Sequence, residues 1–273
     1  MARKPRVYIG VGHGGSDPGA VGYLVEKDVN LKMALALKNF LDANGVDTKI
    51  SRTNDKANEL SNRIREADAW NADLAIDVHN NAGGGDGAEV LYSIVGGTGK
   101  VLAQNILDEL IKIGQNSRGI KTRVGSGGLD YFGFIRDTNM PAVITESAFV
   151  DTKADAAQID EAHEQKAFGE AIGKGTLKTL KQMGFELTAT PVSKPTTNAT
   201  TSTFKPYLVK KNCDVLNIRS GAGTNYNVVG QIDKNNDYKY TIVEEKAGKG
   251  SDKGWGKLKS GAGWISLDWV KKV

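Results

Sequence analysis

The order of apolar and polar residues predicts alternating strands and helices over the first 183 residues. Short apolar runs are typical of buried strands, and apolar residues at helical spacing lie between them. The expected strands cover residues 7–9, 46–50, 73–78, 88–93 and 142–146. The expected helices cover residues 26–41, 55–70, 99–113 and 153–183, the last with a break near Asp160. This alternation favours an α/β fold with a mixed, mostly parallel sheet flanked by helices.

One long segment of this region, residues 114–140, follows neither period, and we expect a polar, glycine-rich loop there. A short aromatic patch lies near its end, where we expect Phe134 and Ile135 to be buried in the core. Long insertions beside a site usually carry function. We therefore expect residues 119–136 to help hold a substrate.

The pattern changes after the last expected helix. Residues 184–205 are rich in Thr, Ser and Pro and have no apolar period, which is typical of an extended linker. From residue 206, short alternating runs separated by Gly and Asn predict a small all-β barrel. The expected organisation is a domain at 1–183, a linker at 184–205 and a second domain at 206–273.

Charge and composition narrow the possible partners. Residues 206–273 hold 12 Lys and Arg against 7 Asp and Glu, whereas the whole chain has a net charge of +4. This surplus indicates either an anionic partner or a solvated surface. We expect no nucleic acid as a partner. We also expect no insertion into a membrane, because no apolar run approaches the roughly 18 residues that a membrane span needs.

The N-terminus and the cysteine content bear on where the protein is made. We see no apolar segment typical of a secretory signal, so we expect synthesis in a reducing cytoplasm. The single cysteine, Cys213, excludes an intrachain disulfide framework and a cysteine-rich zinc site.

Three chemically active side chains follow or end three of the expected strands. His13 follows residues 7–9, His79 ends the run at 73–78, and Glu146 ends the run at 142–146. In open α/β sheets, sites form outside the carboxyl ends of strands, so we expect these side chains at one edge. Two imidazoles and one carboxylate are a common catalytic zinc set. Glu26 and Glu146 are both candidate carboxylate ligands, and sequence spacing does not choose between them.

Two further motifs match known patterns only in part. Residues 10–15 fit the dinucleotide-binding pattern G-x-G-x-x-G, but Pro18 and Gly19 oppose the helix that should begin there. His163 begins an H-E-x-x-H pattern in which Ala167 stands where the second histidine is needed. We interpret His163 as a surface histidine.

Several segments resemble the zinc-dependent N-acetylmuramoyl-L-alanine amidases of the amidase type 3 family. They run in the family's order: HGGSDPGA at 13–20, SRT at 51–53, VHNNA at 78–82 and MPAVITESAF at 140–149. The resemblance spans residues 6 to about 180. It implies a peptidoglycan substrate and hydrolysis of the bond between N-acetylmuramic acid and L-alanine.

The resemblance also implies roles for individual residues. One Zn²⁺ ion would be held by His13, Glu26 and His79. Glu146 would take a proton from the attacking water and return it to the departing amine of L-alanine, and for this its pKa should exceed the ordinary value of ~4.3. The candidate substrate contacts are Gly14, Ser16 and Asn81.

Two positions depart from the family's usual pattern. The family usually has Asp-Pro-Gly before its first ligand, where this chain has Gly10-Val11-Gly12. It usually has Ser two residues before its third ligand, where this chain has Asp77. One hypothesis is that the lost and the gained aspartate exchange the same supporting role on a zinc-bound imidazole.

The C-terminal part is similar to bacterial SH3-type wall-binding domains. The matching segments are LNIRSGAGTNY at 216–226, WGKL at 255–258 and GWI at 263–265. The resemblance implies an anionic or peptidoglycan ligand in the cell wall. We expect most of Tyr226, Trp255 and Trp264 to belong to the core of so small a barrel.

The complete arrangement resembles a phage endolysin. Such an enzyme would be made in the host cytoplasm and would act at the cell wall after a separate protein permeabilises the membrane. Two other functions stay open: a zinc endopeptidase or carboxypeptidase that cuts within the stem peptide, and a catalytically inactive wall-binding protein. The full set of His13, Glu26, His79 and Glu146 argues against the second.

Overall fold

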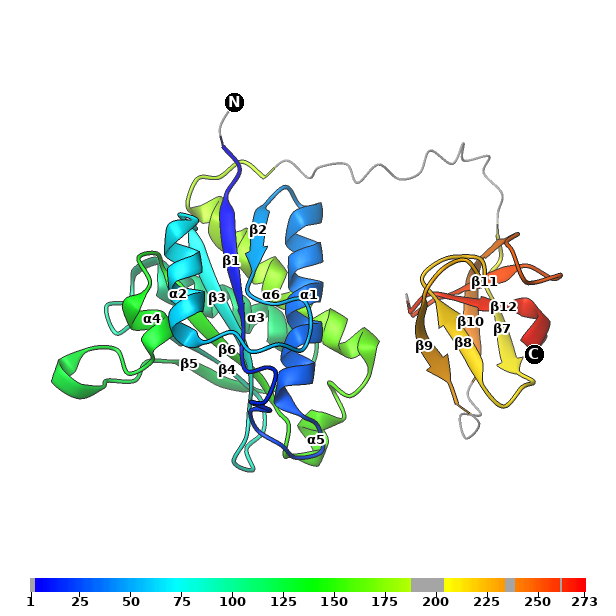
Figure 1. The fold of residues 1–273 in the computed structure, drawn as a ribbon, viewed down its shortest axis with the longest axis horizontal. Helices are drawn as coiled ribbons and strands as arrows, with labels where there is room; N and C mark the ends of the chain where they lie inside the picture. The colour runs from blue at the N-terminus through cyan, green and yellow to red at the C-terminus, as the bar shows by residue number, and fades with distance from the viewer. Residues whose placement is uncertain (1–2, 188–203, 234–238, 261) are drawn as a thin grey trace. The chain divides into compact units, whose positions relative to one another are not determined.

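The computed structural model describes residues 3–187, 204–233, 239–260 and 262–273. The chain divides into two compact units, Met1–Lys194 and Pro195–Val273 (Figure 1). Most of the predicted linker at 184–205 lies outside the described residues, so its extended form stays a prediction. Within the described residues, every helix is too short or too polar to cross a membrane.

The described part of the first unit is built on a six-stranded sheet. Across the sheet the strands are β2 (Asp47–Ile50), β1 (Arg6–Val11), β3 (Leu74–Asn81), β6 (Ala142–Phe149), β4 (Ala88–Tyr92) and β5 (Ser117–Lys121). Strands β2, β1, β3 and β6 are parallel, whereas β4 is antiparallel to β6 and parallel to β5. The predicted mixed, mostly parallel α/β sheet is therefore confirmed.

Helices cover both faces of this sheet (Figure 1). On one face, helix α6 (Ala162–Gln182) packs against both α1 (Glu26–Ala43) and α3 (Gly97–Lys112). On the other face, α2 (Leu60–Ala69) packs against α4 (Gly133–Asp137). Alternate side chains of β1 pack on opposite faces of the sheet. Val7 and Ile9 belong to the core under α1, whereas Tyr8 belongs to the core under α2. Burial on both faces explains why the central strands read as continuous apolar runs.

Several predicted boundaries differ from the structure. The helix expected at 55–70 begins only at Leu60, because the Asp55 side chain accepts hydrogen bonds from Gly15 N (2.7 Å) and Lys27 Nζ (2.7 Å) and so holds its segment as a loop. The break near Asp160 is confirmed, since α5 (Lys153–Ala156) and α6 are separate helices.

The prediction of a polar, glycine-rich loop at 114–140 is only partly correct. This segment contains the edge strand β5, the short 3₁₀ helix η1 (Ser126–Gly128) and helix α4. Edge strand β5 has only one apolar residue, Ile120, so it carries no alternating signal. The expected burial of Phe134 and Ile135 is confirmed, with 1% and 6% of their surfaces exposed.

Among its described residues, the second unit forms an antiparallel sheet of seven strands. Their order is β13 (Val270–Lys272), β7 (Tyr207–Lys211), β10 (Tyr240–Lys246), β11 (Trp255–Leu258), β12 (Trp264–Ser266), β8 (Leu216–Arg219) and β9 (Val228–Ile232), with the 3₁₀ helix η2 (Leu267–Trp269) before β13. The predicted all-β character is confirmed, and the SH3-like barrel stays a prediction. The expectation that most of Tyr226, Trp255 and Trp264 belong to the core is wrong: only Trp255 is buried, Trp264 is half-buried and Tyr226 is 46% exposed.

Candidate metal centre

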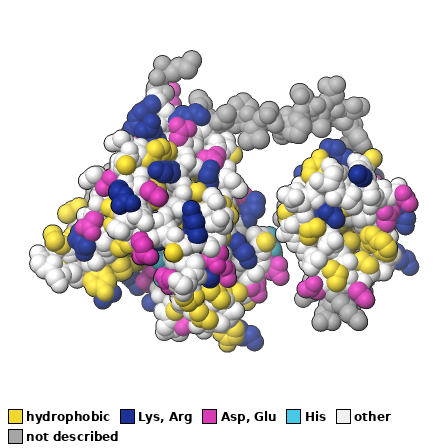
Figure 2. Space-filling view, viewed as in Figure 1, with side chains coloured by type: hydrophobic (Ala, Val, Ile, Leu, Met, Phe, Trp, Pro, Cys, Tyr) yellow, Lys and Arg dark blue, Asp and Glu magenta, His cyan; other side chains and the backbone are white. Residues whose placement is uncertain are grey.

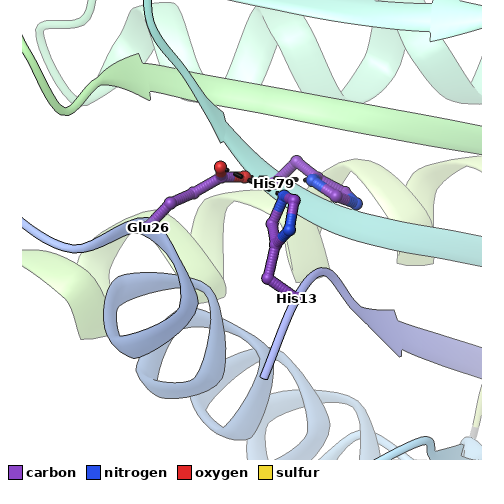
Figure 3. Close-up of side chains that lie close together, drawn as sticks. All are labelled: His13, Glu26 and His79. Atoms are coloured by element: carbon purple, nitrogen blue, oxygen red, sulfur yellow. Dashed lines mark hydrogen bonds and ion pairs between the residues drawn. The ribbon is translucent and has the colours of Figure 1, made fainter. Parts of the chain in front are cut away.

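Three side chains from three separate elements converge beyond the end of β1 (Figure 3). His13 follows β1, Glu26 is the first residue of α1, and His79 lies on β3. Their potential ligand atoms all lie within 4.8 Å of one another. The convergence requires a glycine at residue 12, where a Cβ atom would lie 2.2 Å from the His79 ring. The fold therefore brings both predicted histidines together with Glu26, one of the two candidate carboxylate ligands.

The Glu26 carboxylate bridges the two imidazoles. Its Oε2 lies 3.1 Å from His13 Nε2, and its Oε1 lies 3.0 Å from His79 Nδ1. The two rings stand nearly perpendicular, with their centroids 5.0 Å apart. Imidazole nitrogen and carboxylate oxygen are the ligands that zinc takes in catalytic sites with three protein ligands. This group of donors could therefore hold a metal ion.

The protein holds Glu26 in its ionised form. The Ala20 N–H donates to Oε2 (2.9 Å), and the Asn30 side chain donates to Oε1 (3.1 Å). Burial alone would raise the pKa of Glu26, but hydrogen bonds with His13 and His79 outweigh burial and hold the pKa well below its ordinary value. A buried carboxylate is thus kept negatively charged in a position to bind a cation.

Further carboxylates contact both imidazoles. His13 Nδ1 lies 2.8 Å from Asp17 Oδ2, and His79 Nε2 lies 3.4 Å from Asp77 Oδ2. Burial lowers the pKa of His79, but the negative charge of Asp77 and the contact with Glu26 outweigh burial and raise it to about 10. Carboxylates thus contact both imidazoles, and their negative charge favours a bound cation.

Glu146 lies beside the group on the neighbouring strand. It pairs in register with His79 across β3 and β6, and with Glu89 across β6 and β4. Its Oε2 is buried and has no hydrogen-bond partner among the described residues. Burial raises the pKa of Glu146 to about 7, against the opposing effect of the His79 charge. This direction agrees with the prediction and gives a carboxyl that can accept or donate a proton near neutral pH.

The structure corrects where these residues lie along their strands. His79 and Glu146 do not end β3 and β6, because the strands continue to Asn81 and Phe149. They come together through the parallel register of two adjacent strands instead. In the continuation of β3 past His79, the buried side chain of Asn80 donates to Asn30 Oδ1 (2.8 Å).

The candidate substrate contacts are less closely grouped. Gly14 lines a cavity of about 190 Å³ together with His13, His79 and Arg63. Ser16 is exposed and does not line it. The Asn81 side chain accepts a hydrogen bond from Ala82 N (2.9 Å) and is not among the cavity residues either. Their roles, like that of residues 119–136, stay predictions.

The structure supports neither of the two motifs that matched known patterns only in part. The glycine loop at 10–15 is not followed by a helix, which removes the context for a dinucleotide site. The His163 side chain is 54% exposed, which confirms its interpretation as a surface histidine.

Two supporting residues were not found from the sequence. Asn30 lies one helical turn after Glu26 on the buried face of α1, and Arg63 donates to the carbonyl of Val11 (3.1 Å). A polar residue on an otherwise apolar helix face was the available signal for Asn30.

Comparison with known proteins identifies relatives of the first unit. The N-acetylmuramoyl-L-alanine amidase family model matches residues 7–178. A sporulation-specific N-acetylmuramoyl-L-alanine amidase of Bacillus subtilis is 36% identical over 182 residues, which cover 65% of this chain and 67% of that protein. An endolysin of Bacillus phage SPP1 is 36% identical over 220 residues, which cover 76% of this chain and 77% of the endolysin.

Solved structures show the same fold. Cwp6 from Clostridium difficile superimposes with a TM-score of 0.64 at 35% identity, over 66% of this chain and 30% of that one. An N-acetylmuramoyl-L-alanine amidase of Nostoc punctiforme superimposes with a TM-score of 0.61 at 28% identity, over 66% of this chain and 99% of that one. Both the predicted family and the predicted enzyme class are confirmed: the chain belongs to the N-acetylmuramoyl-L-alanine amidase family.

Proposed function

We propose that this chain is a zinc-dependent hydrolase that cleaves the amide bond between N-acetylmuramic acid and L-alanine in peptidoglycan. Membership of the amidase family supports the reaction. The single observation that carries the metal dependence is the convergence of His13, Glu26 and His79, with their ligand atoms within 4.8 Å of one another. Two imidazoles and a carboxylate held ionised fit zinc by donor type and charge.

Each ligand would be presented by a fixed element. His13 and His79 would offer imidazole nitrogens, and Glu26 would offer a carboxylate oxygen from the start of α1. The chemistry that a bound zinc ion supplies is Lewis acidity toward the scissile carbonyl and the attacking water. Because the three residues belong to different parts of the chain, the centre forms only when the first unit is folded.

Glu146 would move the proton in this reaction. Its carboxylate would take a proton from the water as the water attacks the lactyl carbonyl of N-acetylmuramic acid. The same carboxyl would then protonate the departing nitrogen of L-alanine, since an amide nitrogen leaves poorly without a proton. The buried position of Glu146 and its raised pKa support both steps.

The second unit would hold the enzyme at the bacterial cell wall. Its excess of basic residues suits an anionic wall polymer, and peptidoglycan itself is the other ligand class to consider. Figure 2 shows basic side chains on the visible face of this unit, together with hydrophobic and acidic ones. Attachment to the wall would raise the local concentration of the first unit near its substrate. The SH3-like assignment and the endolysin role belong to this proposal, and the phage endolysin relative supports the latter.

Digestion of purified bacterial walls tests the proposal. The full-length protein should release soluble peptides, lose this activity with a chelator and regain it with Zn²⁺. Glu146→Gln should retain zinc but lose about 10²–10⁴-fold in rate, the usual contribution of a general acid–base residue. Activity that survives complete metal removal would refute the zinc dependence, and a wild-type rate for Glu146→Gln would refute the role of Glu146.

A further inference from the structure

Asp77 is a buried carboxylate that the proposed mechanism does not use. It lies on β3 two residues before His79, and only 1% of its surface is exposed. Its Oδ1 has no hydrogen-bond partner among the described residues. A buried charge is costly unless nearby groups compensate it, so its neighbours indicate why it is there.

Asp77 lies between a cation and a proposed metal ligand. Its Oδ2 lies 3.4 Å from Arg63 Nη2 and 3.4 Å from His79 Nε2. The other ring nitrogen of His79, Nδ1, faces Glu26. The two nitrogens of one imidazole are thus directed to two different carboxylates. Such a histidine can donate its Nε2–H to Asp77 while Nδ1 stays free to bind a metal.

The space for Asp77 depends on Gly10. The two residues are register partners on β1 and β3. A Cβ atom at residue 10 would lie 2.2 Å from Asp77 Oδ1 and 2.9 Å from Asp77 Cγ. Any side chain at residue 10 would therefore displace the Asp77 carboxylate. The need at this position is for space, since Gly10 is not among the glycines with positive φ.

We propose that Asp77 is a positioning residue for the metal centre, and that Gly10 and Asp77 are interdependent. Asp77 fixes the ring of His79 with Nδ1 toward Glu26, Arg63 holds Asp77 in place, and Gly10 leaves room for it. An aspartate at residue 10 combined with a serine at residue 77 would supply the carboxylate from β1 instead of β3. This inference rests on the proposed zinc dependence.

Zinc affinity of the full-length protein tests this inference without any assay of activity. The variants are Asp77→Asn, Asp77→Ser, Gly10→Asp and the double variant Gly10→Asp/Asp77→Ser. Affinity is measured by competition with a chromophoric chelator, and the visible spectrum of the Co²⁺-substituted protein reports the ligand geometry. Asp155→Asn is the matched control, because Asp155 is also fully buried but accepts hydrogen bonds from Gly87 N and Phe149 N.

Each single change at Asp77 should weaken zinc binding by about 10–100-fold, the usual cost of losing such a supporting group. Gly10→Asp alone should also weaken binding, whereas the double variant should recover most of the affinity and the wild-type Co²⁺ spectrum. The control should lose thermal stability but keep its zinc affinity.

Wild-type affinity and an unchanged Co²⁺ spectrum in both Asp77 variants would overturn the positioning role. A double variant no better than Asp77→Ser would overturn the interdependence of Gly10 and Asp77. A wild-type protein that binds no zinc would instead refute the proposed function, so the two failures are distinguishable.

Discussion

Replacing Glu146 with Gln should stabilise the metal-free protein at alkaline pH, even though it removes the proposed proton carrier. The carboxyl is buried beside Glu89, and its Oε2 has no hydrogen-bond partner among the described residues. Burial raises the pKa of Glu146 from 4.5 to about 7. A tenfold change in proton affinity is worth about 1.4 kcal/mol, so ionisation of Glu146 lowers the free energy of unfolding by about 3 kcal/mol.

The sign follows from proton binding. Because the folded state binds this proton more tightly than the unfolded state, wild-type stability is fully present below pH 4.5 and declines as the pH rises to about 7. Glutamine does not titrate. The Glu146→Gln variant should therefore match the wild type at low pH and exceed it by about 3 kcal/mol above neutral pH.

Urea unfolding of chelator-treated, full-length protein at about pH 4 and about pH 8 measures this difference. Far-UV circular dichroism follows the first unit, because the α-helices of the described residues all belong to it. Glu89→Gln is the matched control: Arg118 and Lys121 pair with Glu89 and lower its pKa despite burial, so this variant should lose stability at the higher pH. Equal stability of Glu146→Gln and wild type at both pH values would refute the reasoning.

Three further predictions concern metal, pH and wall binding. His79→Ala should lose its bound zinc, and elemental analysis that shows a full site would rule out His79 as a ligand. The rate of wall digestion should rise with pH between 4.5 and about 7, because Glu146 must be ionised to accept a proton. Burial raises the pKa of Glu146 and a bound cation lowers it, which sets these two limits. A pH–rate profile that rises only below this range would contradict the role of Glu146 as the base. Binding of the full-length protein to purified walls should weaken as salt screens the basic residues of the second unit, and binding that is insensitive to salt would indicate an uncharged ligand.

Hydrophobic periodicity predicted most of the first unit, because its central strands and long helices are buried. It failed where polar contacts decide the structure. The start of α2 is delayed because Asp55 binds Gly15 and Lys27. Strand β3 continues past His79, where the buried side-chain nitrogen of Asn80 donates to Asn30. Such contacts join residues that are far apart in the sequence, so a local pattern cannot reveal them.

The sequence predicted the two histidines of the site but left the carboxylate open between Glu26 and Glu146 on spacing alone. The fold distinguishes them. Glu26, at the start of α1, contacts both imidazoles, whereas Glu146 reaches the site from β6 in register with His79. For Gly10 and Asp77, the sequence alone provided no physical reason why the two residues should depend on each other. The strand register supplies it, because the two residues are partners and a Cβ atom at residue 10 would clash with the Asp77 carboxylate.

The most direct test of the central claim is the identity of the amino terminus that the full-length protein creates in purified walls. Mass spectrometry of the released peptides, with and without a chelator, measures it. The account predicts intact stem peptides that begin with L-alanine, that disappear on chelation and that return with Zn²⁺. Peptides that begin at an interior residue of the stem would show that the protein is an endopeptidase. Wall binding without any release of peptides would show that it is an inactive wall-binding protein. Either result would contradict the account.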